Sequence, residues 1–291
     1  MKLCLISPTS GLEQFASLSD GIHLTLAHLI SKTNKYTKYY KARKRVYGDE
    51  LIMDNGAFEF KKPLSTDEIV EKAEILEPDY VVAPDYPYES WEKTVESTLK
   101  FIEDLKKRGL AGKYRIFAVP QSEIGDIKGW LKAFLRFQQI PEIDMIGMSI
   151  LALPTAFCKE TNSIEIETNR LYATKYLKNK GYVGNKKLHY LGGGDKIHLL
   201  SQYDIAYSLD TSSPIWHGFH GIRMDQHKGL LEGKTRIEVD FNAKIPEDRF
   251  PDIMWNIACM QWWSKGNKVV NFEDHEILNK EKVTTRRKII G

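Results

Sequence analysis

Short apolar runs rich in β-branched residues recur along the chain, and each is followed by a stretch with apolar residues at helical spacing. Runs of this length are typical of buried strands, and their alternation with amphipathic segments favours a parallel sheet covered by helices. Seven runs are predicted as strands: Lys2–Ser7, Glu50–Met53, Tyr80–Ala83, Arg115–Val119, Met145–Ser149, Leu188–Leu191 and Ile205–Ser208.

The amphipathic stretches carry helix-start signals. Ser65 and Ser90 each place a hydroxyl just ahead of acidic residues, which is the pattern of a capped first turn. The predicted helices are Ser65–Leu76, Ser90–Lys107, Ser122–Phe137 and Ile164–Asn179, with a C-terminal helix at Asp252–Ser264.

An eighth strand decides between two architectures. Arg236–Phe241 is the candidate for it, and eight strands would close a (β/α)₈ TIM-like barrel, for which 291 residues suffice. The competitor is an open doubly wound sheet, but no G-x-G-x-x-G fingerprint follows the first strand. We therefore predict one α/β barrel domain over residues 1–291, with 250–291 as a C-terminal helical segment and basic tail.

Composition narrows the class of protein. No run approaches the roughly 20 apolar residues of a membrane span, and Pro8 interrupts the N-terminal apolar run too early for a signal peptide. A cytoplasmic location is the default expectation. The cysteines Cys4, Cys158 and Cys259 are too far apart for a disulfide framework or a cysteine-based zinc site. A net charge of +3 permits nucleic-acid binding without indicating it.

Polar side chains follow six of the predicted strands. In a barrel these strand ends converge on the face where active sites of this fold are built. Asp54, Asp85 and Asp210 supply three carboxylates without an adjacent lysine or arginine. A lone strand-end aspartate is often only a helix cap, but several carboxylates in one pocket suit glycosidic-bond chemistry.

At these same positions the sequence resembles the tRNA-guanine transglycosylases. The resemblance spans roughly residues 50–215 in the family's own order. Asp54-Asn55-Gly56-Ala57-Phe58-Glu59 resembles Asp-Ser-Gly-Gly-aromatic-Gln, Val82-Ala83-Pro84-Asp85 resembles Ala-Phe-Asp, and Val119-Pro120-Gln121 resembles Val-Gln-Gly. Ile146-Gly147-Met148-Ser149 falls at a glycine-rich turn, His189–Gly194 resembles Arg-Tyr-Leu-Met-Gly-Val-Gly, and Tyr207–Pro214 falls where the family has Phe-Asp and a Pro-Thr-Arg segment.

The departures from the family narrow the expected substrate. The C-terminal zinc site of three cysteines and a histidine is absent, the arginine expected after Asp210 is missing, and the chain lacks the length for the peripheral elements that hold tRNA. What remains is similar to the compact phage-type branch that inserts 7-deazaguanines into DNA. The resemblance therefore favours DNA over tRNA as the polymer, with a free 7-deazaguanine base as co-substrate and no cofactor or metal.

The resemblance also implies roles for individual residues. Asp210 is expected to attack C1′ of guanosine, and Asp54 to protonate the departing guanine. Asp85 would accept hydrogen bonds from N1 and N2 of the base, while Gln121 and the Gly147 backbone would donate to O6. Phe58 would stack on the base, and Gly192 and Gly193 would border it.

Three further features stay open. A basic run and the C-terminal arginines are candidates for contact with the nucleic-acid backbone: Lys41, Arg43, Lys44, Arg45, Arg286 and Arg287. A role for the His217, His220 and His227 group is not defined, since no carboxylate at ligand spacing supports a metal. The alternative functions are a tRNA-guanine transglycosylase, a non-catalytic nucleic-acid-binding partner subunit, and an unrelated TIM-barrel glycosidase.

Overall fold

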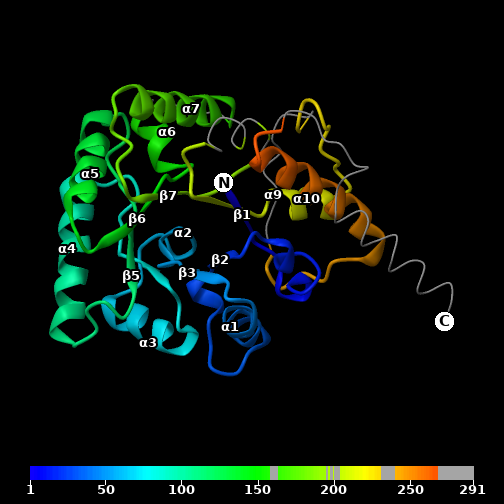
Figure 1. Ribbon diagram of the computed structural model, residues 1–291, viewed down its shortest axis with the longest axis horizontal. Coiled ribbons are helices and arrows are strands. Elements are labelled where there is room, and N and C mark those ends of the chain that lie inside the picture. Colours follow the sequence, from blue (N-terminus) through cyan, green and yellow to red (C-terminus); the bar gives the residue numbers. More distant parts are fainter. Residues whose placement is uncertain (158–162, 195, 197–198, 200–203, 231–239, 268–291) are drawn as a thin grey trace.

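Eight parallel strands form one nearly closed barrel with helices on its outside (Figure 1). The computed structural model describes residues 1–157, 163–194, 196, 199, 204–230 and 240–267. The strands are hydrogen-bonded in the order β1-β8-β7-β6-β5-β4-β3-β2. Their bounds are β1 Lys2–Leu5, β2 Ile22–Thr25, β3 Glu50–Met53, β4 Tyr80–Val82, β5 Arg115–Ala118, β6 Ile143–Gly147, β7 Lys187–Tyr190 and β8 Ser208–Thr211. The expected (β/α)₈ architecture is confirmed.

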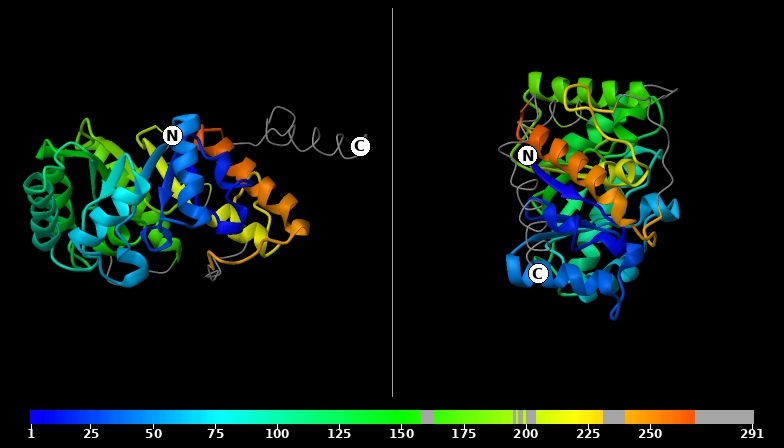
Figure 2. Two further views of the ribbon diagram at one scale, coloured as in Figure 1. Left: turned by 90° about the horizontal axis from the view of Figure 1, so that it is seen from below. Right: turned by 90° about the vertical axis from the view of Figure 1, so that its right-hand side faces the viewer.

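An α-helix or a pair of α-helices follows β2, β3, β4, β5, β6 and β8, whereas β1 and β2 are joined by 3-10 turns. The last two helices lie on the opposite side of the barrel from α4 and α5 (Figure 2). Gly218 of α9 allows a close approach, since a Cβ there would lie 2.6 Å from the Ile253 backbone of α10. The helices are α1 Lys35–Tyr47, α2 Ala57–Phe60, α3 Thr66–Leu76, α4 Trp91–Lys107, α5 Ile127–Gln139, α6 Ala152–Phe157, α7 Ser163–Asn179, α9 Ser213–Phe219 and α10 Phe250–Ser264.

The seam between β1 and β2 has no ladder, and the segment before β2 satisfies the β1 backbone instead. The Leu3 N–H donates to Asp20 Oδ2 and the Leu5 N–H to Ser19 Oγ, both at 2.9 Å. On the other side of the seam, the Leu24 N–H donates to Cys4 Sγ at 2.9 Å. These side chains take the place of strand partners, so the barrel has no open edge there.

The sequence located seven strands and misplaced the eighth. The missing strand is β2, Ile22–Thr25, whose His23 and Thr25 are buried polar residues rather than an apolar run. Arg236–Phe241 was the wrong candidate: residues 236–239 lie outside the described residues, and Asp240 and Phe241 are not in a strand. The last strand begins at Ser208 rather than Ile205, because residues 204 and 205 form a turn.

Most predicted helices are confirmed. Ser65 and Ser90 are N-caps, and Ser65 forms a complete capping box with Glu68. The helix expected from Ser122 begins only at Ile127, because Asp126 caps it by accepting from the Gly129 N–H. Helix α1 was not predicted, and it contains the basic run at residues 41–45.

Two apolar layers fill the molecule. One lies between the strands and the helices, and the other lies inside the barrel. The inner layer comes from alternate positions along the strands, as the two-residue period of a strand requires. It is made of Cys4, Ile6, Ile22, Leu24, Leu26, Ile52, Tyr80, Val82, Phe117, Val119 and Met145.

A charged cluster lies at the amino ends of the strands, around Glu50. Its carboxylate meets Lys2 at 3.1 Å, Arg115 at 3.2 Å and Lys187 at 3.3 Å. Burial alone would raise the pKa of Glu50, but hydrogen bonds from Tyr207 and Lys2 and the charges of Lys187 and Lys2 lower it to about 2. One carboxylate thus offsets three cations.

Replacing Glu50 by glutamine is expected to reduce the free energy of unfolding at pH 7 by about 2 kcal/mol, because it leaves the three cations facing one another. The cations are a third to a half exposed, which keeps the effect below that of a fully buried pair. Since the folded pKa is depressed, the wild-type advantage should shrink as pH falls from about 4.5 toward 2. Urea unfolding of the wild type and the variant, at pH 7 and again at acidic pH, measures this difference in stability. Glu103→Gln, in an exposed ion pair on α4, is the control and should change nothing measurable. An equal loss in the two variants would contradict this account of the cluster.

Among the described helices, none is long and apolar enough to cross a membrane. The predicted C-terminal helix is confirmed as α10, two residues longer at its start than expected. The basic tail expected after it, residues 268–291, lies outside the described part of the chain.

Candidate active site

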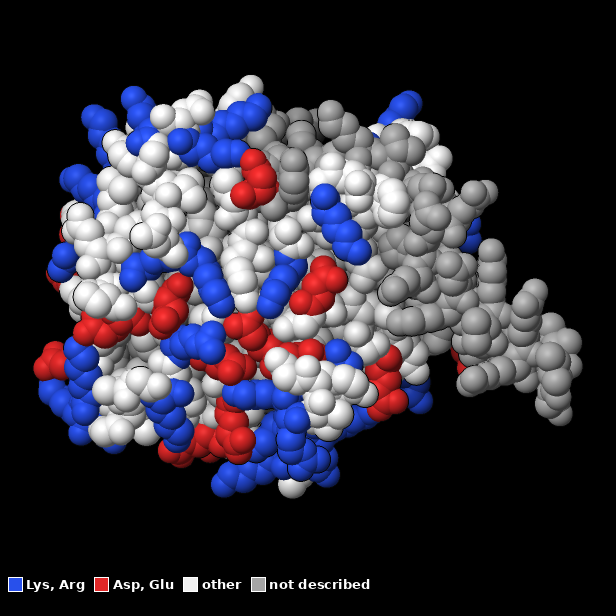
Figure 3. Space-filling view, viewed as in Figure 1, with Lys and Arg blue, Asp and Glu red and all other residues white. Residues whose placement is uncertain are grey.

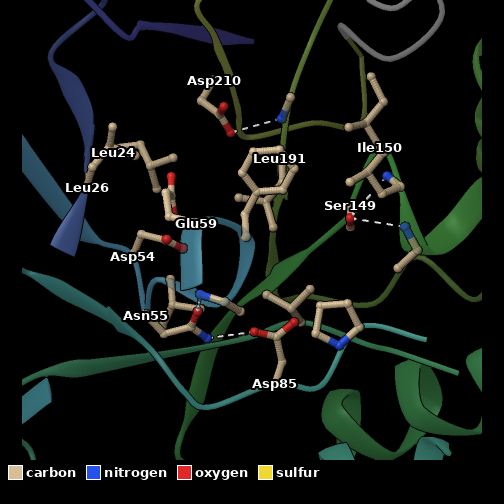
Figure 4. A pocket seen from close by; sticks show the side chains of 18 of the residues that line it. Leu24, Leu26, Asp54, Asn55, Glu59, Asp85, Ser149, Ile150, Leu191 and Asp210 are labelled. Carbon is tan, nitrogen blue, oxygen red and sulfur yellow. Dashed lines mark hydrogen bonds between the residues drawn. The ribbon is translucent and has the colours of Figure 1, made fainter. Parts of the chain in front are cut away.

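A pocket of about 780 Å³ opens at the carboxyl ends of the strands (Figure 4). Residues in or just after each of the eight strands line it; those that follow β6 belong to the turn at residues 149–152. Four carboxylates from three regions of the sequence meet here: Asp54, Glu59, Asp85 and Asp210. The predicted convergence of strand-end acids is confirmed.

Asp210 lies within β8, opposite Cys4 of β1, and not in the loop after the strand. Its side chain is 7% exposed and borders the pocket. Oδ1 accepts hydrogen bonds from the His189 ring at 3.0 Å and from the Gly192 N–H at 3.1 Å. Among the described residues no hydrogen bond reaches Oδ2, which leaves that oxygen for a ligand.

Asp54 and Glu59 lie next to each other on one wall, between Asp210 and Asp85 in the view of Figure 4. Burial raises the pKa of Asp54 to about 7, and the charges of Glu59 and Asp210 act in the same direction. Burial also raises the pKa of Glu59, whose Oε2 is buried without a hydrogen-bond partner. A carboxyl that titrates near neutral pH is suited to donate and to take back a proton.

Replacing Glu59 by glutamine is expected to lower the pKa of Asp54 by on the order of one pH unit, because a like charge next to it is removed. After burial, the charge of Glu59 is the strongest influence that raises the pKa of Asp54. NMR titration of the Asp54 carboxyl carbon measures it. Glu89→Gln, at a glutamate paired with Lys93 outside this wall, serves as the control. An unchanged Asp54 titration in Glu59→Gln would mean that burial alone sets the value.

Asp85 is held by two amides. Asn55 Nδ2 donates to Oδ1 at 2.6 Å, and Gln121 Nε2 donates to Oδ2. Burial raises the pKa of Asp85 to about 6, and these two hydrogen bonds limit the rise. Each carboxylate oxygen keeps a second lone pair, so Asp85 presents a flat pair of acceptors to a ligand. Gln121 Oε1 is buried without a partner and adds a third acceptor.

Apolar side chains form most of the remaining wall. Leu24 and Leu26 lie on one side and Leu191 and Ile150 on the other, with the carboxylates between them (Figure 4). Val82 and Val119 complete this lining. Apolar side chains with a few convergent polar groups are the usual composition of a site for a small organic ligand, and here the polar groups are acceptors.

The mouth of the pocket carries exposed aromatic rings. Phe58 borders the pocket but is 62% exposed, so its ring lies at the rim rather than on the floor. Tyr88 is 41% exposed at the same rim, and Lys61 Nζ lies 4.9 Å from the centre of the Phe58 ring. Lys61 and Tyr88 both have positive φ, at 61° and 67°. Such strain in side-chain-bearing residues is common at functional sites.

The three glycines expected to contact the base, Gly147, Gly192 and Gly193, lie at different distances from the pocket. Gly192 lines the pocket, as predicted. Gly193 packs under Leu209, since a Cβ there would lie 2.4 Å from that side chain. Gly147 lies inside β6 and not in the lining, where Phe117, Val119 and Leu191 fill the space beside it. Gly147 is therefore not among the residues that line the pocket, and the turn at residues 149–152 borders it instead.

The basic run lies at the other end of the barrel, on α1 just before the start of β3. Lys41 pairs with Glu77, Arg43 with Asp49 and Lys44 with Asp79. Figure 3 shows Lys and Arg side chains beside Asp and Glu over this part of the surface. Lys41, Arg43 and Lys44 thus form ion pairs away from the pocket, and contact of these residues and of the exposed Arg45 with nucleic acid stays a prediction. Arg286 and Arg287 lie outside the described residues.

No group of three His, Cys, Asp or Glu side chains in the described ranges is arranged for a metal ion. Nδ1 of His217 lies 2.7 Å from the backbone oxygen of Ser213, and the ring of His220 packs against the ring of Phe219. His227 contacts its neighbour Gln226. Cys4 and Cys259 are buried in β1 and α10, while Cys158 lies outside the described residues.

The sequence did not identify four residues of this site. Asn55 and Glu59 stand in the first motif, where the family has serine and glutamine, so their departure from the family pattern was the available signal. His189 likewise stands where the family has arginine, whereas Arg170 had no such signal. Their contacts depend on the pairing of β7 with β8 and on the docking of α7.

No protein-family model matches the chain, and no curated protein matches it significantly in sequence. Support for an activity therefore comes from the pocket and from the resemblance of the motifs that line it.

Proposed function

We propose that the chain is a guanine transglycosylase that exchanges guanine in DNA for a 7-deazaguanine such as 7-cyano-7-deazaguanine. One observation carries the proposal: three groups share one pocket, namely a carboxylate with one oxygen that no described residue hydrogen-bonds, a carboxyl with a pKa near 7 and a flat pair of acceptors. These are Asp210, Asp54 and Asp85, the residues that the resemblance assigns to the nucleophile, the proton donor and the base-binding group.

The first half of the reaction releases guanine. Asp210 Oδ2 attacks C1′ of the target nucleotide, and the C1′–N9 bond breaks with its electron pair going to the base. Asp54, protonated below about pH 7, gives its proton to the departing guanine. The product is a covalent sugar ester on Asp210.

The second half inserts the new base. A 7-deazaguanine occupies the vacated pocket and loses its N9 proton to the Asp54 carboxylate. N9 then attacks C1′, and the ester bond breaks with its electrons returning to Asp210. Two inversions restore the original configuration, as in a retaining glycosidase with a base in the place of water.

Hydrogen-bond chemistry supports guanine as the ligand. Guanine presents N1–H and N2–H₂ donors side by side, and Asp85 offers two acceptors in the same plane. Gln121 donates to Asp85 through Nε2, and its second Nε2 hydrogen can donate to O6. Leu24 and Leu191 supply apolar surface for the faces of a planar ring. A base must leave the helical stack to reach this depth.

The choice of DNA over tRNA as the polymer depends on a feature of the tRNA enzymes that this sequence lacks. The sequence has no zinc-site motif of their kind, which favours the DNA branch. A non-catalytic partner subunit would tolerate loss of the reacting groups, whereas this pocket keeps all of them, which favours an enzyme.

The test is incorporation of radiolabelled guanine into guanine-containing DNA, single- and double-stranded, and into tRNA, with Asp210→Asn as the blank. The proposal predicts label in DNA. Label in tRNA alone would keep the chemistry and overturn the polymer. No label in any polymer, from a protein that is folded and monodisperse, would favour the partner-subunit reading.

A further inference from the structure

A buried histidine contacts the candidate nucleophile. His189 of β7 is fully buried, and its Nε2 lies 3.0 Å from Asp210 Oδ1. Its Nδ1 lies 2.7 Å from Ser208 Oγ. Ser208 and Asp210 are two residues apart on β8, so their side chains point to the same side of the strand and contact the two nitrogens of one ring.

These contacts define the proton positions. A carboxylate can only accept, so Nε2 carries the proton that is shared with Asp210. In a neutral ring Nδ1 is then an acceptor, and the Ser208 hydroxyl donates to it. Asp210 thus favours the tautomer with the proton on Nε2, and Ser208 satisfies the other nitrogen and holds the ring in place. Phe117 packs edge-on against the ring with centroids 5.5 Å apart, which limits rotation of the imidazole.

A second donor approaches the same oxygen from the end of β7. The Gly192 N–H donates to Asp210 Oδ1 at 3.1 Å, and the carbonyl of the same peptide group, Leu191 O, accepts from Arg170 Nη1 at 3.0 Å. Arg170 is fully buried, and burial lowers its pKa to about 10, so it is cationic at neutral pH. A cation on the carbonyl strengthens donation by the N–H at the other end of the peptide.

Glycine is required at this turn. Gly192 has φ of +74°, and a Cβ there would lie 2.8 Å from the Ile150 side chain. The backbone can therefore bring its N–H to Asp210 only without a side chain. Both donors to Oδ1 are thus built into the end of β7.

We propose that His189, held by Ser208, is a positioning residue that binds Oδ1 of Asp210 and directs Oδ2 at the sugar carbon. This inference rests on the proposed role of Asp210 as nucleophile. A carboxylate held on one oxygen cannot rotate about its Cβ–Cγ bond, so the reactive oxygen stays in the attacking geometry. Misplacement of a reacting group by about 1 Å costs on the order of 100-fold in rate.

Two substitutions of similar size separate this role from simple packing. His189→Gln places an amide N–H near the position of Nε2 and keeps a donor to Asp210. His189→Asn places its amide near Nδ1, keeps the contact with Ser208 and loses the one with Asp210. We expect His189→Gln to keep the single-turnover rate of guanine release within about 10-fold, and His189→Asn to reduce it about 100-fold. KM for the polynucleotide should stay near the wild-type value in both.

Ser208→Ala is a second, milder test that removes only a hydroxyl. It should reduce the same rate by about 10-fold, because the ring loses the hydrogen bond at Nδ1 that holds it in the orientation in which Nε2 donates to Asp210. Thermal unfolding of all three variants reports whether they fold.

Equal rates in His189→Gln and His189→Asn, or a rate in Ser208→Ala equal to the wild type, would overturn the inference. If either His189 variant does not fold, the Ser208→Ala rate alone decides. A wild-type protein that exchanges no guanine would instead contradict the proposed function itself, so the two failures are distinguishable.

Discussion

Asp210→Asn is expected to reduce guanine exchange by about 10⁴-fold or more, the largest effect of any single substitution in this chain. The amide cannot form the sugar ester, so the double-displacement route is closed. Stability should change little, because the asparagine Oδ1 can still accept from His189 and Gly192 at the positions that hold the carboxylate. Single-turnover exchange with labelled guanine measures the rate, and thermal unfolding measures the fold.

The matched control is Asp67→Asn, the same chemical change at an exposed aspartate of α3 that pairs with Arg108. It should leave exchange unchanged. Exchange within 10-fold of wild type in Asp210→Asn would show that another group attacks the sugar.

Asp54→Asn is expected to have the second-largest effect, a loss of about 10² to 10⁴-fold in the rate of guanine release. Asparagine has no acidic proton to give, so the base must leave as an anion. The wild-type rate of release should fall as pH rises through about 7, where Asp54 loses its proton, and insertion of the new base should fall as pH drops below it.

Measuring both half-reactions between pH 5.5 and 8.5 tests this assignment. The variant should lose the pH dependence near 7 as well as the rate. Asp85→Asn is the informative comparison, because it should raise KM for the free base more than it lowers kcat. If the rate of Asp54→Asn still changed with pH near 7, the titrating group would be another residue.

The fold was largely predictable because its strands are short apolar runs between capped helices. The exception, β2, was missed for a physical reason. His23 pairs with Asp49 at 2.9 Å and Thr25 donates to Ile52 O at 2.8 Å, so the strand buries polar groups that are satisfied only after folding. Hydropathy along the chain does not contain that information.

The site was predictable to the extent that strand ends converge. Asp54, Asp85, Gln121 and Asp210 come together because each lies at the carboxyl end of a strand. Gly147 does not join them, since β6 extends through it and inner side chains fill the space beside it. The ion pairs of the α1 cations were not predictable, because their partners Glu77, Asp49 and Asp79 are brought to α1 by the tertiary fold.

The sequence did not predict the contact of His189 with Asp210 or the arrival of Arg170 beside it. His189 contacts Asp210 through the register that pairs it with Ser208, and Arg170 arrives from α7. Such contacts are set by strand register and helix docking, which no spacing along one chain specifies.

The most direct test of the account is isolation of the covalent intermediate. The protein is incubated with a guanine-containing DNA strand without an incoming base, denatured and digested, and the peptides are analysed by mass spectrometry. The account predicts a sugar ester on the peptide that contains Asp210, which disappears when 7-cyano-7-deazaguanine is added before denaturation. An adduct on any other carboxylate, or continued base exchange with no adduct on Asp210, would contradict it.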